Sequence, residues 1–279
     1  MPRVRLGVVL LVPPPLDGRV DGLRAAFGDP AADQVAPHLT LVPPVNVAPR
    51  DLPAALAVLR ASAGEARPLD LRLGPIRVFP GVEHVAFLAV DGEPGQLDRL
   101  RKLRAAVLQP PLERALEHDF VPHVTVTQGI DSPRLAAVLE ATTDLRPVAV
   151  RFDRVHLLQE HHTAEGRRWI PIADVALAAP VIVGRGGLPL ELTPSERVDP
   201  EALVARPELA DVEADRPAGT VGLVVTARRE GAVVGVVWGW TAGPEGALVD
   251  AWLPVPDGDV ERHLASAWSS AAADRGALS

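Results

Sequence analysis

The chain contains no cysteine and no tyrosine among its 279 residues, and its single lysine is Lys102. Without cysteine, disulfide scaffolds, thiolate-bound zinc and thiol nucleophiles are excluded. Long apolar runs are also lacking, since a stretch such as Leu6 to Val12 ends at Pro13 and is too short for a transmembrane helix. No small-residue cleavage site follows that stretch, so we expect no signal peptide, no membrane partner and a cytoplasmic location.

Apolar residues make up 47% of the chain and charged residues 23%, which is ample material for a buried core. At about 150 residues per domain, the length is typical of one large domain or two smaller ones. The acidity is uneven, because residues 1–176 have a net charge of −1 and residues 177–279 a net charge of −7. The near-neutral first part need not repel a polyanionic substrate, and it is not a basic coat for nucleic acid either.

Two similar series of elements are predicted in the first part: strand, helix, strand beginning with histidine, helix. The predicted strands are 3–12, 38–42, 69–79, 84–90, 123–127, 148–158 and 168–175, with a turn at Pro80 and Gly81 and a polar turn at 161–166. The predicted helices are 16–27, 52–59, 96–108 and 133–140, the last capped by Ser132. This order predicts an α+β fold of two lobes, with mostly antiparallel sheets covered by helices.

Each series carries one copy of a five-residue motif. Residues 37–41 read Pro-His-Leu-Thr-Leu, and residues 122–126 read Pro-His-Val-Thr-Val. Side chains two apart on a strand point to the same face. His38 and Thr40 therefore share one face, and we expect His123, Thr125 and Thr127 to share another. If the two strands are neighbours, two imidazoles and several hydroxyls converge on one cleft.

Two imidazoles suit phosphodiester chemistry without a metal. A neutral histidine can take a proton from the attacking water or hydroxyl, and an imidazolium can give a proton to the leaving oxygen. Threonine hydroxyls can hold the non-bridging phosphate oxygens between them. His38 and His123 are thus the candidate acid and base, in either assignment, and Thr40, Thr125 and Thr127 the candidate phosphate-binding residues, with no cofactor expected.

Residues 3–176 resemble the 2H phosphoesterase superfamily, and within it the bacterial RNA 2′,3′-cyclic phosphodiesterases, also called 2′-5′ RNA ligases. The resemblance rests on the two motifs, their separation, the element order and the Val-Phe-Pro turn at 78–80. It implies a two-lobed α+β fold with a cleft between the lobes. It also implies opening of 2′,3′-cyclic phosphates, with an RNA end or a cyclic nucleotide as substrate, by His38 and His123.

The sequence departs from that family at two places. Many members have an arginine close after the second motif, whereas residues 127–129 here read Thr-Gln-Gly. Since the chain has no tyrosine to stack a base, Phe79 or Phe120 would have to serve. A basic run at residues 99–104 is expected to be a solvated helix face.

The last third divides into an expected linker at 179–220, with one short helix, and a smaller module at 221–279. The module is predicted to hold a hairpin turning at Glu230 and Gly231, a strand at 247–255 and a helix at 260–275. It resembles the second half of a GNAT acetyltransferase, a small α/β module. The loop at 255–264 lacks the Gly-x-Gly that holds pyrophosphate in that family and carries acidic residues, so we expect a degenerate module without acetyl-CoA.

The predicted first domain is therefore 1–178, followed by the linker and by the GNAT-like domain. The module could serve packing or association, including self-association through Trp238, Trp240 and Trp252, which could equally be core. Two alternatives to the phosphodiesterase remain open at this point. One is a binding module that holds a phosphorylated ligand or RNA without turnover, and the other is N-acetyltransferase activity in the last third.

Overall fold

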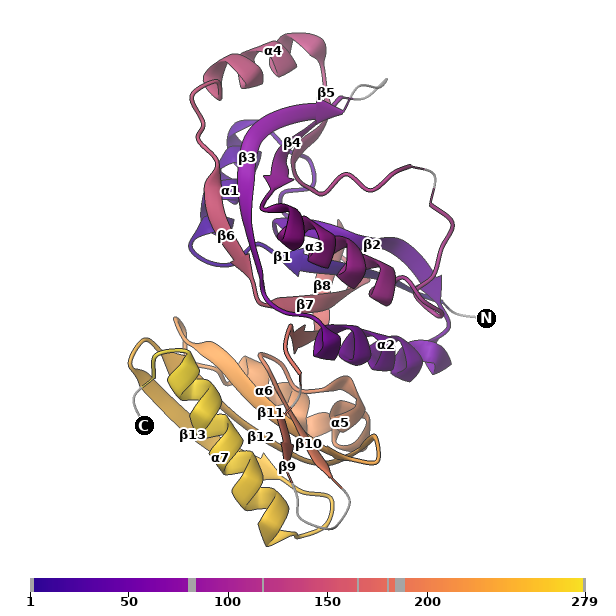
Figure 1. Ribbon diagram of the computed structural model, residues 1–279, viewed down its shortest axis with the longest axis vertical. Helices are drawn as coiled ribbons and strands as arrows, with labels where there is room; N and C mark the ends of the chain where they lie inside the picture. Colours follow the sequence, from indigo (N-terminus) through magenta and orange to yellow (C-terminus); the bar gives the residue numbers. More distant parts are fainter. Residues whose placement is uncertain are drawn as a thin grey trace. The chain divides into compact units, whose positions relative to one another are not determined.

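The computed structural model describes residues 3–79, 84–116, 118–164, 166–179, 181–183 and 189–277 (Figure 1). The chain divides into two compact units, Met1–Pro171 and Ile172–Ser279, and each is treated by itself below. Within the described ranges, none of the helices has the length and apolar character needed to span a membrane. The turn predicted at Pro80 and Gly81 lies outside the described residues.

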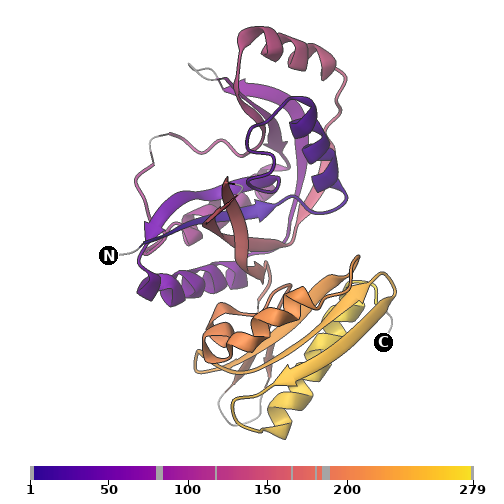
Figure 2. The ribbon, with the colours of Figure 1, turned by 180° about the vertical axis from the view of Figure 1, so that it is seen from behind.

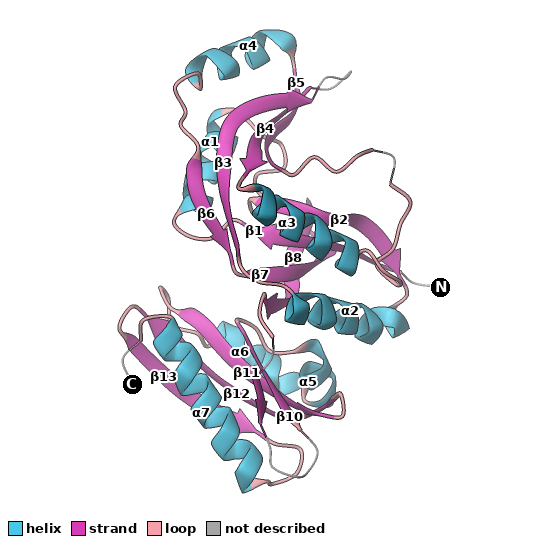
Figure 3. Cartoon of the chain, viewed as in Figure 1, coloured by secondary structure: helices cyan, strands magenta, loops and turns pink. Residues whose placement is uncertain are grey.

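An eight-stranded sheet forms the frame of the first unit, in the strand order β6-β3-β4-β5-β2-β1-β7-β8. Its strands are β1 (Val4–Leu11), β2 (His38–Val47), β3 (Leu69–Phe79), β4 (His84–Asp91), β5 (His123–Ile130), β6 (Val148–Phe152), β7 (Arg154–Thr163) and β8 (Gly166–Ala176). The strand pairs with a defined register are antiparallel. The predicted antiparallel α+β architecture is thus confirmed for this unit (Figure 3).

The sheet consists of two halves that meet where β5 lies beside β2. Four helices accompany it: α1 (Leu16–Ala26), α2 (Leu52–Glu65), which follows a short 3-10 turn at Pro49–Asp51, α3 (Pro94–Val107) and α4 (Ser132–Ala141). One helix of each half reaches across the junction, since α1, which follows β1, contacts β5, and α3, which follows β4, contacts β2 in addition to β3 of its own half (Figure 1). The second helices stay with their own halves, α2 on β7 and α4 on β4. This exchange ties the two halves together around the β5–β2 junction.

Two local predictions in this unit are wrong. The strand predicted at 148–158 is two strands, β6 beside β3 and β7 beside β1, separated at Asp153. The burial pattern changes there, since burial alternates through Val150 and Phe152 in β6 and becomes continuous over 155–158 in β7. The helix α4 is also capped one residue earlier than predicted. Its N-cap is Asp131, whose carboxylate accepts a hydrogen bond from the backbone N–H of Arg134.

The second unit is built on a five-stranded sheet in the order β13-β12-β11-β10-β9. Its strands are β9 (Val181–Val183), β10 (Leu190–Ser195), β11 (Val221–Arg229), β12 (Ala232–Ala242) and β13 (Glu245–Trp252). The hairpin predicted at Glu230 and Gly231 is confirmed, and both residues have positive φ, as a tight two-residue turn requires. The predicted strand 247–255 begins and ends earlier, as β13.

The linker expected at 179–220 is wrong in the part that the structure describes. β10 pairs with β11 from Leu190 to Ser195, so this segment is an integral strand of the sheet. The segment also forms α5 (Pro200–Ala205), a 3-10 turn at Pro207–Ala210 and α6 (Asp211–Ala214). Its apolar residues are few, but their spacing places Leu190 and Leu192 on one face of β10, where both are buried.

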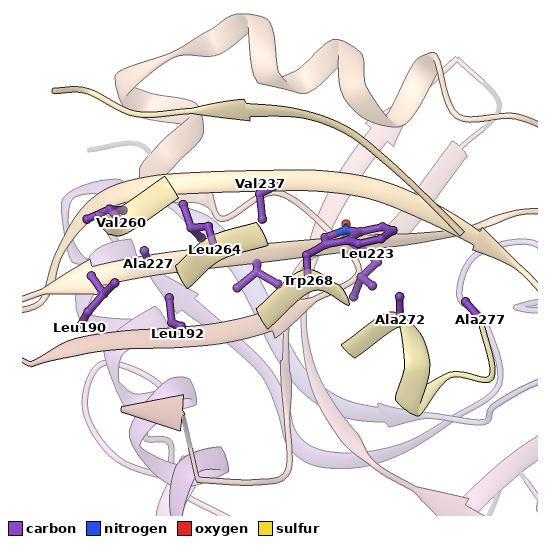
Figure 4. Close-up of a cluster of buried hydrophobic side chains, with 11 residues drawn as sticks. Leu190, Leu192, Leu223, Ala227, Val237, Val260, Leu264, Trp268, Ala272 and Ala277 are labelled. Carbon is purple, nitrogen blue, oxygen red and sulfur yellow. The ribbon is translucent and has the colours of Figure 1, made fainter. Parts of the chain in front are cut away.

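Both faces of this sheet are covered. The helix α7 (Gly258–Asp274) lays Leu264 and Trp268 over the strands, and the Trp268 indole N–H donates to the Leu223 carbonyl at 2.9 Å (Figure 4). The helices α5 and α6 lie on the opposite face (Figure 2). Trp238 is buried there, with Trp252 packed against the same cluster. These two tryptophans therefore belong to the core and are not the apolar interaction surface that the sequence allowed.

Candidate active site

The two His-x-Thr motifs lie on neighbouring strands. β2 pairs with β5 in antiparallel register at Leu39 and Val124, and both of these side chains are fully buried. Because alternate residues point to opposite faces, the flanking histidines and threonines all lie on the other face of the sheet. The register places His38 opposite Thr125, and His123 opposite the remaining motif threonine, Thr40.

The structure does not place Thr127 with these four residues. Thr125 pairs with Phe87 of β4, whereas Thr127 pairs with Ala86, with a bulge between the two pairs. Since adjacent residues of β4 point to opposite faces, the two threonines do as well. Thr127 is 2% exposed, in keeping with an inward position. The expectation that it shares the face of His123 is therefore wrong, because the bulge shifts the phase of β5.

Both imidazoles are held in the same way. The Nδ1 of His38 lies 2.8 Å from the Ala36 carbonyl oxygen, and the Nδ1 of His123 lies 2.7 Å from the Val121 carbonyl oxygen. A carbonyl oxygen only accepts, so each Nδ1 carries a proton and donates it. The Nε2 atom of each ring is then left for a ligand, as acceptor when the ring is neutral and as donor when it is protonated.

Burial and charge set the protonation of the pair. Burial lowers the pKa of His38 below its ordinary 6.5, against the hydrogen bond to Ala36, and the charges of Arg24 and His123 lower it further. Burial also lowers the pKa of His123, against the hydrogen bond to Val121. Near neutral pH both rings are therefore biased toward the uncharged form that can accept a proton.

Arg24 is a buried cation beside this site that the sequence did not single out. Its guanidinium bonds Asp29 at 2.9 Å, Asp21 at 3.0 Å and two backbone carbonyls, of Ala31 and Val35, at 2.8 Å each. These contacts tie the end of α1 to the segment that leads into β2. Arg24 thus fixes the backbone just ahead of His38, a role that depends on tertiary packing and leaves no local pattern.

Two phenylalanines pack beside His123. The rings of Phe79 and Phe87 stack with 4.1 Å between centroids, and both meet the His123 imidazole edge-on, at 5.0 and 5.4 Å. Such contacts restrict rotation of the imidazole and exclude water from one side of it. Phe79 was a candidate for stacking a base, but in this structure its partners are Phe87 and His123.

A pocket of about 380 Å³ opens next to the motifs. It is lined by residues of β2, including Thr40, by Arg104 of α3, by the segment around Phe120 and by His123. Arg104 was expected to be solvated with the rest of its run, but its guanidinium lies 4.4 Å from the centre of the Phe120 ring. The sequence held a signal for this position, since Leu100 and Val107, four before and three after it, are buried.

No group of three or more histidine, aspartate or glutamate side chains suited to a metal ion occurs among the described residues. The features that can bind a ligand are thus the two imidazoles, the motif hydroxyls and the arginines in the pocket. Paired His-x-Thr motifs, joined across two halves of an antiparallel sheet, are the arrangement of a phosphoesterase of the two-histidine class.

Comparison with known proteins supports the same class. Residues 12–164, more than half of the chain, match the 2′-5′ RNA ligase superfamily, and the chain belongs to this family. A Bacillus pumilus (strain SAFR-032) protein named "Putative phosphoesterase" is 31% identical over 159 residues, which are 56% of this chain and 90% of that protein. A Bacillus cereus (strain G9842) protein of the same kind is 29% identical over 49% of this chain and 76% of its own length. Family membership supports phosphoesterase activity.

The chain is also similar to solved structures. Escherichia coli LigT complexed with 3′-AMP is 18% identical with a TM-score of 0.45, over 63% of this chain and 99% of that chain. The Thermus thermophilus protein TT0787 is 21% identical with a TM-score of 0.44, over 62% of this chain and 97% of that chain.

Proposed function

We propose that the protein hydrolyses 2′,3′-cyclic phosphates, at an RNA end or on a small nucleotide, with His38 and His123 as the general acid–base pair. The observation that supports this most is the matched geometry of the two rings. Each imidazole donates through Nδ1 to the carbonyl two residues before it and leaves Nε2 for the substrate. Two such nitrogens on adjacent strands can serve the attacking and the leaving oxygen of one phosphorus.

In the proposed reaction the neutral imidazole accepts a proton from water as the water oxygen bonds to phosphorus. The bond from phosphorus to the 3′ oxygen breaks, and the protonated imidazole donates its proton to that oxygen. The product is a 2′-phosphate with a free 3′-hydroxyl, and the two rings have exchanged protonation states. Arg24, whose charge opposes imidazolium at His38, supports His38 as the base and His123 as the acid.

The hydroxyls of Thr40 and Thr125 complete the proposed site. Each lies opposite a histidine in the antiparallel register, so each can donate to a non-bridging phosphate oxygen while the two rings act. The two imidazoles supply both proton transfers, so the proposal assigns no role to a metal ion or another cofactor.

The test is hydrolysis of 2′,3′-cyclic nucleotides and of an RNA with a cyclic phosphate end, in EDTA, by the unsubstituted protein, His38→Ala and His123→Ala. We expect each substitution to lower kcat by about 10²- to 10⁴-fold, the usual contribution of one positioned acid or base. His162→Ala is the matched control, since the His162 side chain is exposed and its Nε2 lies 3.2 Å from the Glu160 carboxylate, outside the two motifs. A kcat close to that of the unsubstituted protein in either active-site variant contradicts the proposal, and ligand binding without turnover by the unsubstituted protein favours a binding module.

For the second unit we propose that acetyl-CoA does not bind, despite the GNAT resemblance. The Asp257 carboxylate caps α7 by accepting from the backbone N–H groups of Asp259 and Val260, at 3.0 and 3.2 Å. Those bonds lower the pKa of Asp257 and keep it ionised, so negative charge already occupies the helix end where a pyrophosphate would lie. Titration of the full chain with acetyl-CoA is expected to show no saturable binding, and saturation would contradict this.

A further inference from the structure

The pocket that His123 lines also contains two arginines, Arg104 and Arg114, that the proposed acid–base chemistry does not use. Thr40 and His123 form one part of its lining, and Arg104 with Phe120 forms another. A substrate phosphate held between the imidazoles would therefore lie at one side of a space of about 380 Å³. That volume is within the range of small-ligand sites, so the rest of a nucleotide fits in it.

Arg104 lacks the partners that a half-buried arginine usually has. Its Nε is buried without a hydrogen-bond partner, and its guanidinium forms no ion pair with any residue that the structure describes. Burial lowers its pKa from the ordinary value. By contrast Arg101, one turn earlier on α3, is exposed and bonds Asp98 at 2.9 Å. A partly desolvated cation without an anion is costly, so this position favours an anionic ligand.

Phe120 orients this cation. With 4.4 Å between the guanidinium carbon and the ring centre, the ring holds the guanidinium by a cation–π contact. The guanidinium covers that face of the ring, so the pair offers hydrogen-bond donors there instead of a bare aromatic surface. Arg114 adds a second positive charge to the lining, while it donates to the Pro44 carbonyl at 2.8 Å. Donors in a planar fork are suited to phosphate oxygens.

We propose that Arg104, held by Phe120, binds a second phosphate of the substrate, beyond the one that lies between His38 and His123. This rests on the proposed function for the identity of the first phosphate. The second phosphate is a 5′-phosphate on a mononucleotide or the internucleotide phosphate of an RNA end, since both are anions carried on the 5′ oxygen of the nucleotide that has the cyclic phosphate. Arg104 is then the residue that distinguishes substrates with a second phosphate from those without one.

The turnover test compares three substrates: adenosine 2′,3′-cyclic phosphate, the same compound with a 5′-phosphate, and a dinucleotide ending in a 2′,3′-cyclic phosphate. We expect kcat/KM to favour one of the doubly phosphorylated substrates by about tenfold or more, as one charge-assisted hydrogen bond allows. Which of them is favoured identifies the source of the second phosphate. In Arg104→Ala the ratio of kcat/KM for the favoured doubly phosphorylated substrate to that for the singly phosphorylated one falls to about one. Arg104→Lys keeps part of this preference, because the charge remains without the planar fork.

Arg101→Ala is the matched control, being a neighbouring arginine of α3 outside the pocket, and it is expected to keep the preference. Calorimetric titration with adenosine 2′-phosphate and adenosine 2′,5′-bisphosphate tests the same subsite without turnover. If no substrate is hydrolysed but the bisphosphate binds about tenfold more tightly in an Arg104-dependent way, the subsite stands and the proposed function fails. Equal binding of the two compounds, or a preference that persists in Arg104→Ala, overturns the inference.

Discussion

Leu39 of β2 pairs with Val124 of β5, and this contact joins the two halves of the sheet in the first unit. Both side chains are fully buried on the face away from the histidines. The same register that buries them places one histidine and one threonine of each motif on the opposite face. The core packing of two apolar residues thus positions the four polar groups of the candidate site.

The two threonines of β5 provide a matched pair of substitutions. Thr125→Val is expected to lower kcat/KM by about 10- to 100-fold, because it removes a hydroxyl that we propose donates to the phosphate. Thr127→Val is expected to leave kcat/KM close to that of the unsubstituted protein, because Thr127 faces inward beyond the bulge. Steady-state kinetics on a 2′,3′-cyclic nucleotide decides this, and equal losses in the two variants would contradict the assignment of faces.

The pH dependence of kcat/KM is expected to have an acidic maximum. The base must be neutral and the acid protonated, and burial lowers the pKa of both histidines below 6.5. Activity is then lost at low pH as the base protonates and lost again at higher pH as the acid deprotonates, so the maximum lies below pH 6.5. The Thr125→Val profile should peak at the same pH, since threonine does not titrate. A maximum at pH 7 or above would contradict the lowered values.

Removal of the Arg24 guanidinium is expected to destabilise the first unit. Arg24→Met leaves the Asp29 carboxylate, whose side chain is 1% exposed, without its ion-pair partner. Breaking a buried pair in this way costs about 3–5 kcal/mol. Asp21→Ala is the control, because Asp21 is half exposed and such pairs contribute about 1 kcal/mol or less. Scanning calorimetry of the full chain measures the unfolding of both variants. Similar losses of stability in the two would show that the Arg24–Asp29 pair contributes no more than the exposed Arg24–Asp21 pair.

A single methyl group at Gly239 is expected to destabilise the second unit. A Cβ there would meet the backbone oxygen of Ala247 and would lie 2.6 Å from the Trp268 ring. Gly239→Ala should therefore cost about 1–3 kcal/mol, the range for overpacked cores, and more if the β12–β13 ladder has to move. Gly258→Ala is the control, since nothing lies within 4 Å of its Cβ position. Tryptophan fluorescence during denaturant unfolding reports mainly on this unit, because all the tryptophans except Trp169 lie in it, and unchanged stability in Gly239→Ala would contradict the packing.

Several features of this protein could be predicted from local sequence. Apolar alternation predicted β3 with the observed bounds, and turn chemistry predicted the hairpin at Glu230 and Gly231. The repeated Pro-His-x-Thr motif indicated two candidate histidines and the class of chemistry. These succeeded because strand alternation and two-residue turns depend on neighbouring residues alone.

Other features were decided by tertiary structure. The bulge that turns Thr127 inward is a property of the β4–β5 pairing, and the split between β6 and β7 follows from the partners that each strand finds. The Arg24 network and the Arg104–Phe120 contact join residues from different elements. Sequence spacing indicates the face of its own strand or helix on which a side chain lies. Strand pairing and helix packing decide which residues of other elements that side chain contacts. The sequence by itself thus determined the candidate groups, and the fold determined their arrangement, because that arrangement depends on contacts between residues far apart in the chain.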